Sequence, residues 1–122
     1  MNPRQTAFEG TEVWQNMTRK DKILQTLQDI QKRPSMYIQK HEEYDIFCSF
    51  MEGWLLGLAV ESDENYLWGT AKHFASIHGC GSSVGLAQLI TIMYPQMSSE
   101  EKRSKYLHTV IDYFENTDLT SG

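Results

Sequence analysis

The chain has 122 residues, which is enough for one domain with its own apolar core and without support from disulfides or a structural metal. Its formal net charge of −5 disfavours nucleic acid as a partner, because phosphate contacts need clustered Lys and Arg, and it favours a basic protein partner. No run approaches the ~20 apolar residues of a membrane-spanning helix, and the amino terminus lacks the pattern of a secretory signal, so we expect a cytoplasmic protein without membrane contact.

The first predicted helix begins at Thr18 and ends at Arg33. Residues 1–17 are weakly periodic, so we expect them to form a partly ordered lead-in. Thr18 is a favourable N-cap, and apolar residues recur at helical spacing over residues 23–30. Pro34 disfavours helical geometry at the residue before it, which predicts that the helix stops at Arg33.

The next segment, Met36-Tyr37-Ile38, is expected to turn back as an apolar anchor. A second helix is predicted over residues 44–60, with Asp45 as its cap and an apolar stripe broad enough for the central helix of the fold. Gly53 and Gly57 lie four residues apart on one face of this helix. We expect that spacing to let another helix or a bulky ring approach the backbone.

Three more helices follow, each preceded by residues that can cap it. They are predicted over residues 66–77, over residues 84–93 and after Ser98, where S-S-E-E reads as a capping box. The other candidate caps are Asn65 or Asp63 for the third helix and Ser82 or Ser83 for the fourth. The sequence therefore predicts an all-α fold, a single compact domain of about five helices with short connections, over residues 18–116. A frayed tail is expected at residues 117–122.

The three tryptophans are expected to differ in their surroundings. Trp54 and Trp68 lie on apolar stripes, which predicts that both are in the core. Trp14 lies in the lead-in, so we expect it to be an exposed anchor for a partner.

His73, His78 and Cys80 form the pattern H-x4-H-G-C, which raises the question of a metal site. Imidazole and thiolate both bind zinc, but this spacing matches no strong zinc pattern. A histidine at the end of a helix also gains from the helix dipole without any metal. We therefore predict no metal ligand and no cofactor.

Cys80 lies in the loop G-C-G-S-S, just before a predicted helix start, where the pKa of a thiol is lowered. A catalytic nucleophile also needs a base and a group that orients the base, and no spacing in the sequence supplies them. We therefore predict that the protein is not an enzyme and has no catalytic residue. A small thiol-dependent enzyme that uses Cys80 with His73 or His78 stays as an alternative.

The carboxylates are scattered over the chain, and their ordinary interpretation is a solvated acidic surface. The functional interpretation is a surface that meets a basic protein. Glu61, Asp63 and Glu64 form the best cluster for that role, because a single turn presents them together. The residues that we predict to bind the partner are Glu61, Asp63, Glu64, Glu42, Glu43 and Asp45.

Residues 23–38 read ILQTLQDIQKRPSMYI, which resembles the helix and R-P-G-M-Y-I-G turn at the start of the ATPase domain of type II topoisomerase B subunits. The chain lacks the metal-binding and nucleotide-binding motifs of that domain, and it is too short to form it. We interpret the match as a shared local structure, and we expect no nucleotide hydrolysis.

Two motifs follow each other along the chain, R-P-S-M-Y at residues 33–37 and F-C-S-F-M-E-G-W at residues 47–54. Together with the size and helix order of residues 20–115, they resemble small bacterial immunity proteins of contact-dependent inhibition and other polymorphic toxin systems. The resemblance implies a protein that neutralises one cognate toxin, commonly a basic nuclease, inside the producing cell by covering its active site. The alternative is a helical adaptor or regulatory subunit that binds a protein other than a toxin.

Overall fold

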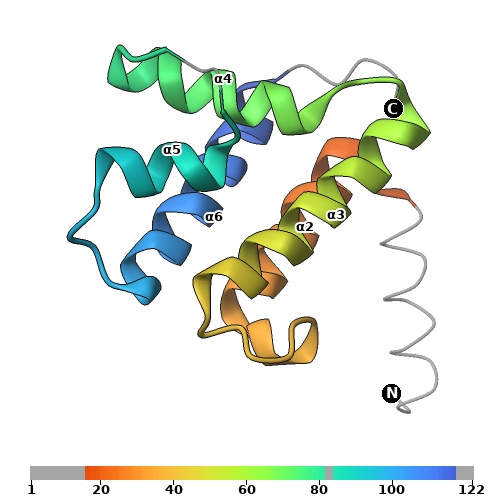
Figure 1. Ribbon diagram of the computed structural model, residues 1–122. Coiled ribbons are helices and arrows are strands. Elements are labelled where there is room, and N and C mark those ends of the chain that lie inside the picture. Colours follow the sequence, from red (N-terminus) through yellow and green to blue (C-terminus); the bar gives the residue numbers. More distant parts are fainter. Residues whose placement is uncertain (1–15, 82–83, 118–122) are drawn as a thin grey trace.

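The computed structural model describes residues 16–81 and 84–117, and within these ranges the chain is all α-helical, as predicted. Five α-helices and one 3₁₀ turn follow each other with short connections over this part of the chain (Figure 1). They are α2 (Arg19–Lys32), η1 (Pro34–Met36), α3 (Tyr44–Ser62), α4 (Tyr66–His78), α5 (Leu86–Met93) and α6 (Ser99–Asn116).

The last helix, α6, is the central one, because it contacts α2, α3, α4 and α5. Figure 1 shows α2 and α3 to the right of α6, α5 to its left, and α4 across the top of the molecule. The prediction that the helix at residues 44–60 is central was wrong. One side of α3 buries Phe47, Met51 and Leu55, but Leu56 and Val60 on its other side are 52% and 79% exposed.

Three of the predicted caps are confirmed. Thr18 Oγ1 accepts a hydrogen bond from the Asp21 N–H (3.1 Å), and Asn65 Oδ1 accepts one from the Trp68 N–H (3.0 Å). Ser98 and the residue at the third position of α6, Glu101, form the reciprocal capping box. These bonds satisfy amide groups that the first turn of a helix leaves without a partner, so the sequence sets the helix starts locally.

Two caps differ from the prediction. The N-cap of α3 is Glu43, and Asp45 lies in the first turn, where its charge favours the positive end of the helix. The fourth predicted helix begins at Leu86 instead of residue 84, and its N-cap is Gly85, which offers no side chain. The candidate caps Ser82 and Ser83 lie outside the described residues, as does the predicted anchor Trp14.

The chain stops α2 at the predicted place, and the Arg33 N–H donates to the Asp29 carbonyl oxygen (2.8 Å). The segment after it is an apolar anchor at one position only. Ile38 is buried, but Met36 and Tyr37 are 70% and 40% exposed. The 3₁₀ turn that begins at Pro34 places three successive side chains on different sides, so they do not all reach the core.

The core is built from aliphatic and aromatic side chains of all five helices. Its largest fully buried members include Tyr66, Tyr106, Phe74 and Phe114. Full burial of one such side chain contributes roughly 1.5–3 kcal/mol of transfer free energy. The tryptophans contribute less than predicted, because Trp54 is only half-buried and Trp68 is 49% exposed.

Candidate functional site

The six carboxylates that we predicted to bind a partner divide into two groups at opposite ends of α3. Asp45 and Glu61 are 16 positions apart in this helix, which corresponds to ~24 Å at 1.5 Å per residue. All six are exposed. The group at the start of α3 is Glu42, Glu43 and Asp45, and the group at its end is Glu61, Asp63 and Glu64. The structure therefore brings the members of each group together but does not join the two groups.

Little of this negative charge is neutralised within the described chain. Over residues 16–81 and 84–117, only two of the six carboxylates form an ion pair. Glu61 Oε1 lies 3.2 Å from Arg19 Nη1, and Glu42 Oε2 lies 4.0 Å from His41 Nε2. The Glu61 side chain is 70% exposed in that pair, so water screens it. A basic partner would therefore meet carboxylates that remain accessible.

The surface between the two acidic groups is unusual for the solvent side of a helix. We call it the α3 outer face and define it by five exposed residues on one side of the helix: Ser49, Gly53, Leu56, Gly57 and Val60. It carries no charged side chain. A Cβ built on Gly53 or Gly57 would meet no described atom within 4 Å outside its neighbours and its own helix backbone. The prediction that these glycines admit another helix or ring is therefore not met within the described chain.

A groove of about 560 Å³ lies between α4 and α6, beside the loop that connects α5 to α6. Phe74, Ile77 and Met97 supply apolar walls, and ionisable groups from α4 and α6 surround them. The ionisable groups that line the groove are His78, Glu101, Lys105, His108 and Asp112. Charges of both signs face this space, so it has no clear preference for an anion or a cation.

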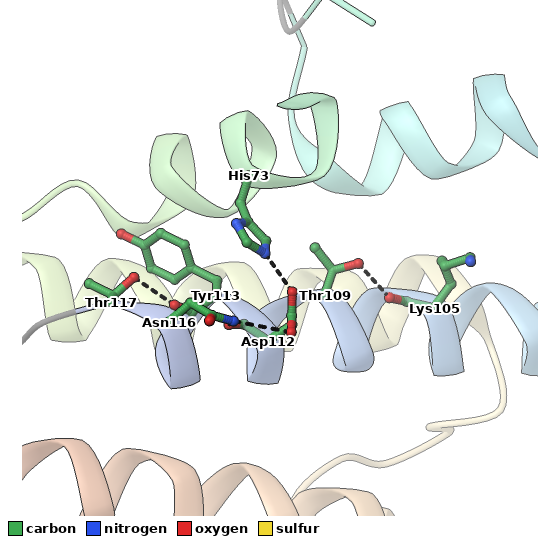
Figure 2. A network of polar contacts seen from close by, with 7 residues as sticks. All are labelled: His73, Lys105, Thr109, Asp112, Tyr113, Asn116 and Thr117. Atoms are coloured by element: carbon green, nitrogen blue, oxygen red, sulfur yellow. Dashed lines mark hydrogen bonds and ion pairs between the residues drawn. The ribbon is translucent and has the colours of Figure 1, made fainter. Parts of the chain in front are cut away.

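One imidazole–carboxylate pair joins the two helices beside this groove. His73 Nε2 on α4 lies 2.7 Å from Asp112 Oδ2 on α6, and Asn116 Nδ2 donates to Asp112 Oδ1 (3.2 Å). Figure 2 shows the His73 ring pointing down from α4 to this carboxylate. Within the described chain, neither His73 nor Asp112 hydrogen-bonds the side chain of a Ser, Thr or Cys. The pair therefore ties α4 to α6, and no described Ser, Thr or Cys accompanies it as an activated nucleophile.

The other residues of the H-x4-H-G-C pattern have separate environments. His78 Nδ1 lies 3.4 Å from Tyr94 Oη, and its ring lies 4.2 Å from the Phe74 ring between centroids. Cys80 is half-buried against the core, and its N–H donates to the Ala75 carbonyl oxygen (3.0 Å). No group of three or more His, Cys, Asp or Glu side chains within the described ranges is arranged to hold a metal ion.

The R-P-S-M-Y motif closes on α2 through one carboxylate. Arg33 Nη2 donates to Asp29 Oδ1 (2.5 Å), and the Tyr37 hydroxyl donates to Asp29 Oδ2. The hydrogen bond from Tyr37, followed by that from Arg33, lowers the pKa of Asp29 below its ordinary value. The polar side chains of this motif thus form a local clasp around the end of α2, which is a structural role.

No protein family, curated protein or solved structure matches this chain in comparisons of its sequence and structure. None of the described helices combines the length and the apolar character that crossing a bilayer requires. The function must therefore be inferred from the surface and the groove themselves.

Sequence reasoning missed the α3 outer face as a candidate site and the groove between α4 and α6. The first had a readable signal, because Asp45, Ser49, Gly53, Gly57 and Glu61 recur at intervals of four along one helix. Such a row lies on one face, and here it is acidic at both ends and small in between. The groove had no comparable signal, since it depends on how α4 and α6 pack.

Proposed function

We propose that this protein is a non-enzymatic inhibitor, an immunity protein that binds a cognate bacterial toxin and blocks its active site. The observation that carries the proposal is the α3 outer face, an uncharged surface that stays exposed between two accessible acidic groups. Exposed apolar surface with a polar rim is typical of protein-interaction sites. The resemblance of the two sequence motifs to immunity proteins supports the identity of the partner.

The length of this surface along α3 suits a stable complex. A standard interface covers about 800 Å² on each partner, which corresponds to a patch roughly 28 Å across. Asp45 and Glu61 are ~24 Å apart along the helix, so one interface of that size reaches both acidic groups. The cleft in which a nuclease binds the phosphate backbone is rich in Lys and Arg, and a negative surface is complementary to it.

The charges have a distinct role in the proposed complex. Exposed carboxylates steer a basic partner and mainly raise the association rate, and salt screens this effect. The uncharged centre of the interface would supply the slow dissociation. The salt dependence of the association rate therefore reports on the carboxylates. The dissociation rate reports on the uncharged residues between them.

The test is to express this chain with the protein encoded beside it, purify the complex, and measure nuclease activity with and without this chain. We expect a complex and loss of activity. We also expect reversal of the charges at Glu61, Asp63 and Glu64 to slow association at low salt, with little effect at high salt. Ser76→Lys is a control, because it adds positive charge at an exposed position of α4, outside both acidic groups. Full inhibition by the triple variant at an unchanged association rate would exclude this acidic group from the interface.

A helical adaptor that binds a protein other than a toxin would use the same surface. The two functions are separated by the neighbouring protein: a partner with no toxic activity that still binds the α3 outer face would identify an adaptor. A small thiol-dependent enzyme has less support, because no histidine side chain within the described chain hydrogen-bonds the Cys80 thiol.

A further inference from the structure

One side of α3 is exposed, and what covers it is inferred here on the basis of the proposed function, that this protein binds a basic partner. An α-helix that is apolar all round is normally buried on all sides. In α3 the side toward the core is buried, while Leu56 and Val60 on the opposite side are 52% and 79% exposed. Within residues 16–81 and 84–117, the α3 outer face is thus an unpartnered helix face.

We propose that this face is the docking site for one amphipathic α-helix of the partner, which lies along α3 and carries basic residues toward both of its ends. The occupant is helical because of the side chains that α3 presents. Gly53 and Gly57 have no side chain on an exposed i, i+4 row, and Leu56 and Val60 are exposed beside that row. A ridge of side chains on a second helix can pack over such a row and bring the two backbones close.

The charges at both ends define the occupant further. Asp45 begins the row and Glu61 ends it, with Glu42 and Glu43 close to the first and Glu64 close to the second. A partner helix that follows α3 therefore needs Lys or Arg near each end, separated by about 16 residues or ~24 Å. Glu61 already has an ion pair with Arg19 at 3.2 Å, but its 70% exposure leaves the carboxylate open to a second cation.

The same charges disfavour a second copy of this chain as the occupant. In an antiparallel pair of α3 helices, Asp45 of each copy would face Glu61 of the other. In a parallel pair, each carboxylate would face its own counterpart. Both arrangements place like charges together at each end, and such contacts oppose association.

The experiment uses the full chain and a synthetic probe. The probe is an Ala-rich helical peptide of about 20 residues with a Leu stripe at i, i+3, i+4 and i+7 and two Lys at each end. A matched peptide carries Glu at the four Lys positions. We expect the Lys peptide to shift the amide NMR signals of Gly53 and Gly57 saturably at low salt. The Glu peptide should leave both signals unchanged.

The decisive variant is Gly53→Gln with Gly57→Gln, which covers the glycine row with polar side chains. Since either added Cβ would meet no described atom within 4 Å outside its neighbours and its own helix backbone, the helix should keep its fold, while the Kd for the Lys peptide should rise by about tenfold or more. Ser76→Gln is the control, because it makes a similar change at an exposed position of α4 and should leave the Kd unchanged. A second variant, Leu56→Ser with Val60→Ser, removes apolar contact without added bulk and should also weaken binding.

Several results would overturn the inference. They are an unchanged Kd in the double Gln variant, no binding of the Lys peptide, and peptide-induced shifts confined to other helices. Self-association of the chain through α3 would make a second copy the occupant. Contacts from Phe8, Val13 or Trp14 to Leu56 or Val60 in NOE spectra would make residues 1–15 the occupant.

The inference and the proposed function fail in different ways. If the double Gln variant inhibits the toxin as well as the wild type but the charge-reversed variant does not, the helix is the wrong occupant and the proposed function stands. If the Lys peptide binds α3 but no neighbouring toxin is inhibited, the docking site stands and the proposed function falls.

Discussion

Gly69 on α4 lies directly against Tyr113 on α6: a Cβ built on the glycine would stand 2.5 Å from Tyr113 Oη and 2.8 Å from Tyr113 Cζ. Only the absence of a side chain at position 69 lets the ring occupy this place. The glycines of α3 have the opposite surroundings, since a Cβ on Gly53 or Gly57 would meet no described atom within 4 Å outside the local chain. The glycine of α4 thus allows a close contact inside the domain, whereas the glycines of α3 lie on an open surface.

Gly69→Ala is expected to destabilise the fold by about 1–3 kcal/mol, because the added methyl group forces the Tyr113 ring to move. The change is informative because alanine is otherwise the better helix former. Urea unfolding of the variant measures the effect. Combining it with Tyr113→Ala should give less than the sum of the two single losses, since the clash is then absent. A Gly69→Ala protein as stable as the wild type would show that the ring moves aside at no cost.

Gly53→Ala is expected to act in the opposite direction and raise the free energy of unfolding by about 0.5–1 kcal/mol. It adds a methyl group to open surface in the middle of α3 and reduces the freedom of the unfolded chain. The same urea titration compares it with Gly69→Ala, so each variant is the control for the other. A loss of stability in Gly53→Ala would mean that part of this chain already covers the α3 outer face.

The sequence predicted the helices well because the signals that begin and end them are local. Thr18, Asn65 and Ser98 bond amides three residues ahead of them, so each cap depends only on its own neighbourhood. Which helix is central depends instead on contacts between distant elements. An apolar stripe shows that a face can be buried, but not that another helix is present to bury it, and this is why α3 was misjudged.

The division of the acidic residues was accessible from the sequence once the second helix was predicted. Asp45 and Glu61 sit at the two ends of one helix, and a helix of that length cannot bring its ends together. The His73–Asp112 contact was not accessible, because these residues are 39 positions apart and meet only through the packing of α4 on α6.

Ser98→Ala is expected to lower the free energy of unfolding by about 1 kcal/mol, because it removes the acceptor for the Glu101 N–H at the start of α6. The central position of α6 means that this loss appears in global unfolding and not only as fraying of one end. Thermal unfolding followed by circular dichroism measures it. Ser104→Ala is a suitable control, since this exposed serine lies within α6 and caps nothing. Equal effects of the two substitutions would contradict a capping role for Ser98.

The two thiols should differ in their reaction with an alkylating reagent at neutral pH. Cys48 is 4% exposed, and burial raises the pKa of its thiol to about 12, so it is both covered and protonated. We expect Cys80 alone to react in the folded protein and both thiols to react in denaturant, as measured by mass spectrometry over time. Modification of Cys48 without unfolding would contradict the packing around α3. A rate at Cys80 far above that of free cysteine would favour the thiol-dependent alternative.

The clasp around Asp29 predicts how stability depends on pH. The hydrogen bond from the Tyr37 hydroxyl is the largest cause of the lowered pKa of Asp29, and the same bond raises the pKa of Tyr37. A lowered carboxyl pKa stabilises the fold above the unfolded value of 3.8, and this stabilisation is lost as the pH falls through the folded pKa. A raised phenol pKa stabilises the fold below the unfolded value of 10.0, and this is lost as the pH rises through the folded pKa.

Tyr37→Phe should therefore lower the free energy of unfolding between pH 3.8 and pH 10.0. The effect should fade as the pH falls through the folded pKa of Asp29 or rises through the folded pKa of Tyr37. In the variant, the pKa of Asp29 should rise toward its ordinary value, which a titration of the carboxyl ¹³C signal measures. Arg33→Gln should raise the same pKa by less, because the hydrogen bond from Arg33 is the second cause. A stability difference between Tyr37→Phe and the wild type that stays constant from acid to neutral pH would show that the lost ring hydroxyl acts through packing, and not through the charge of Asp29.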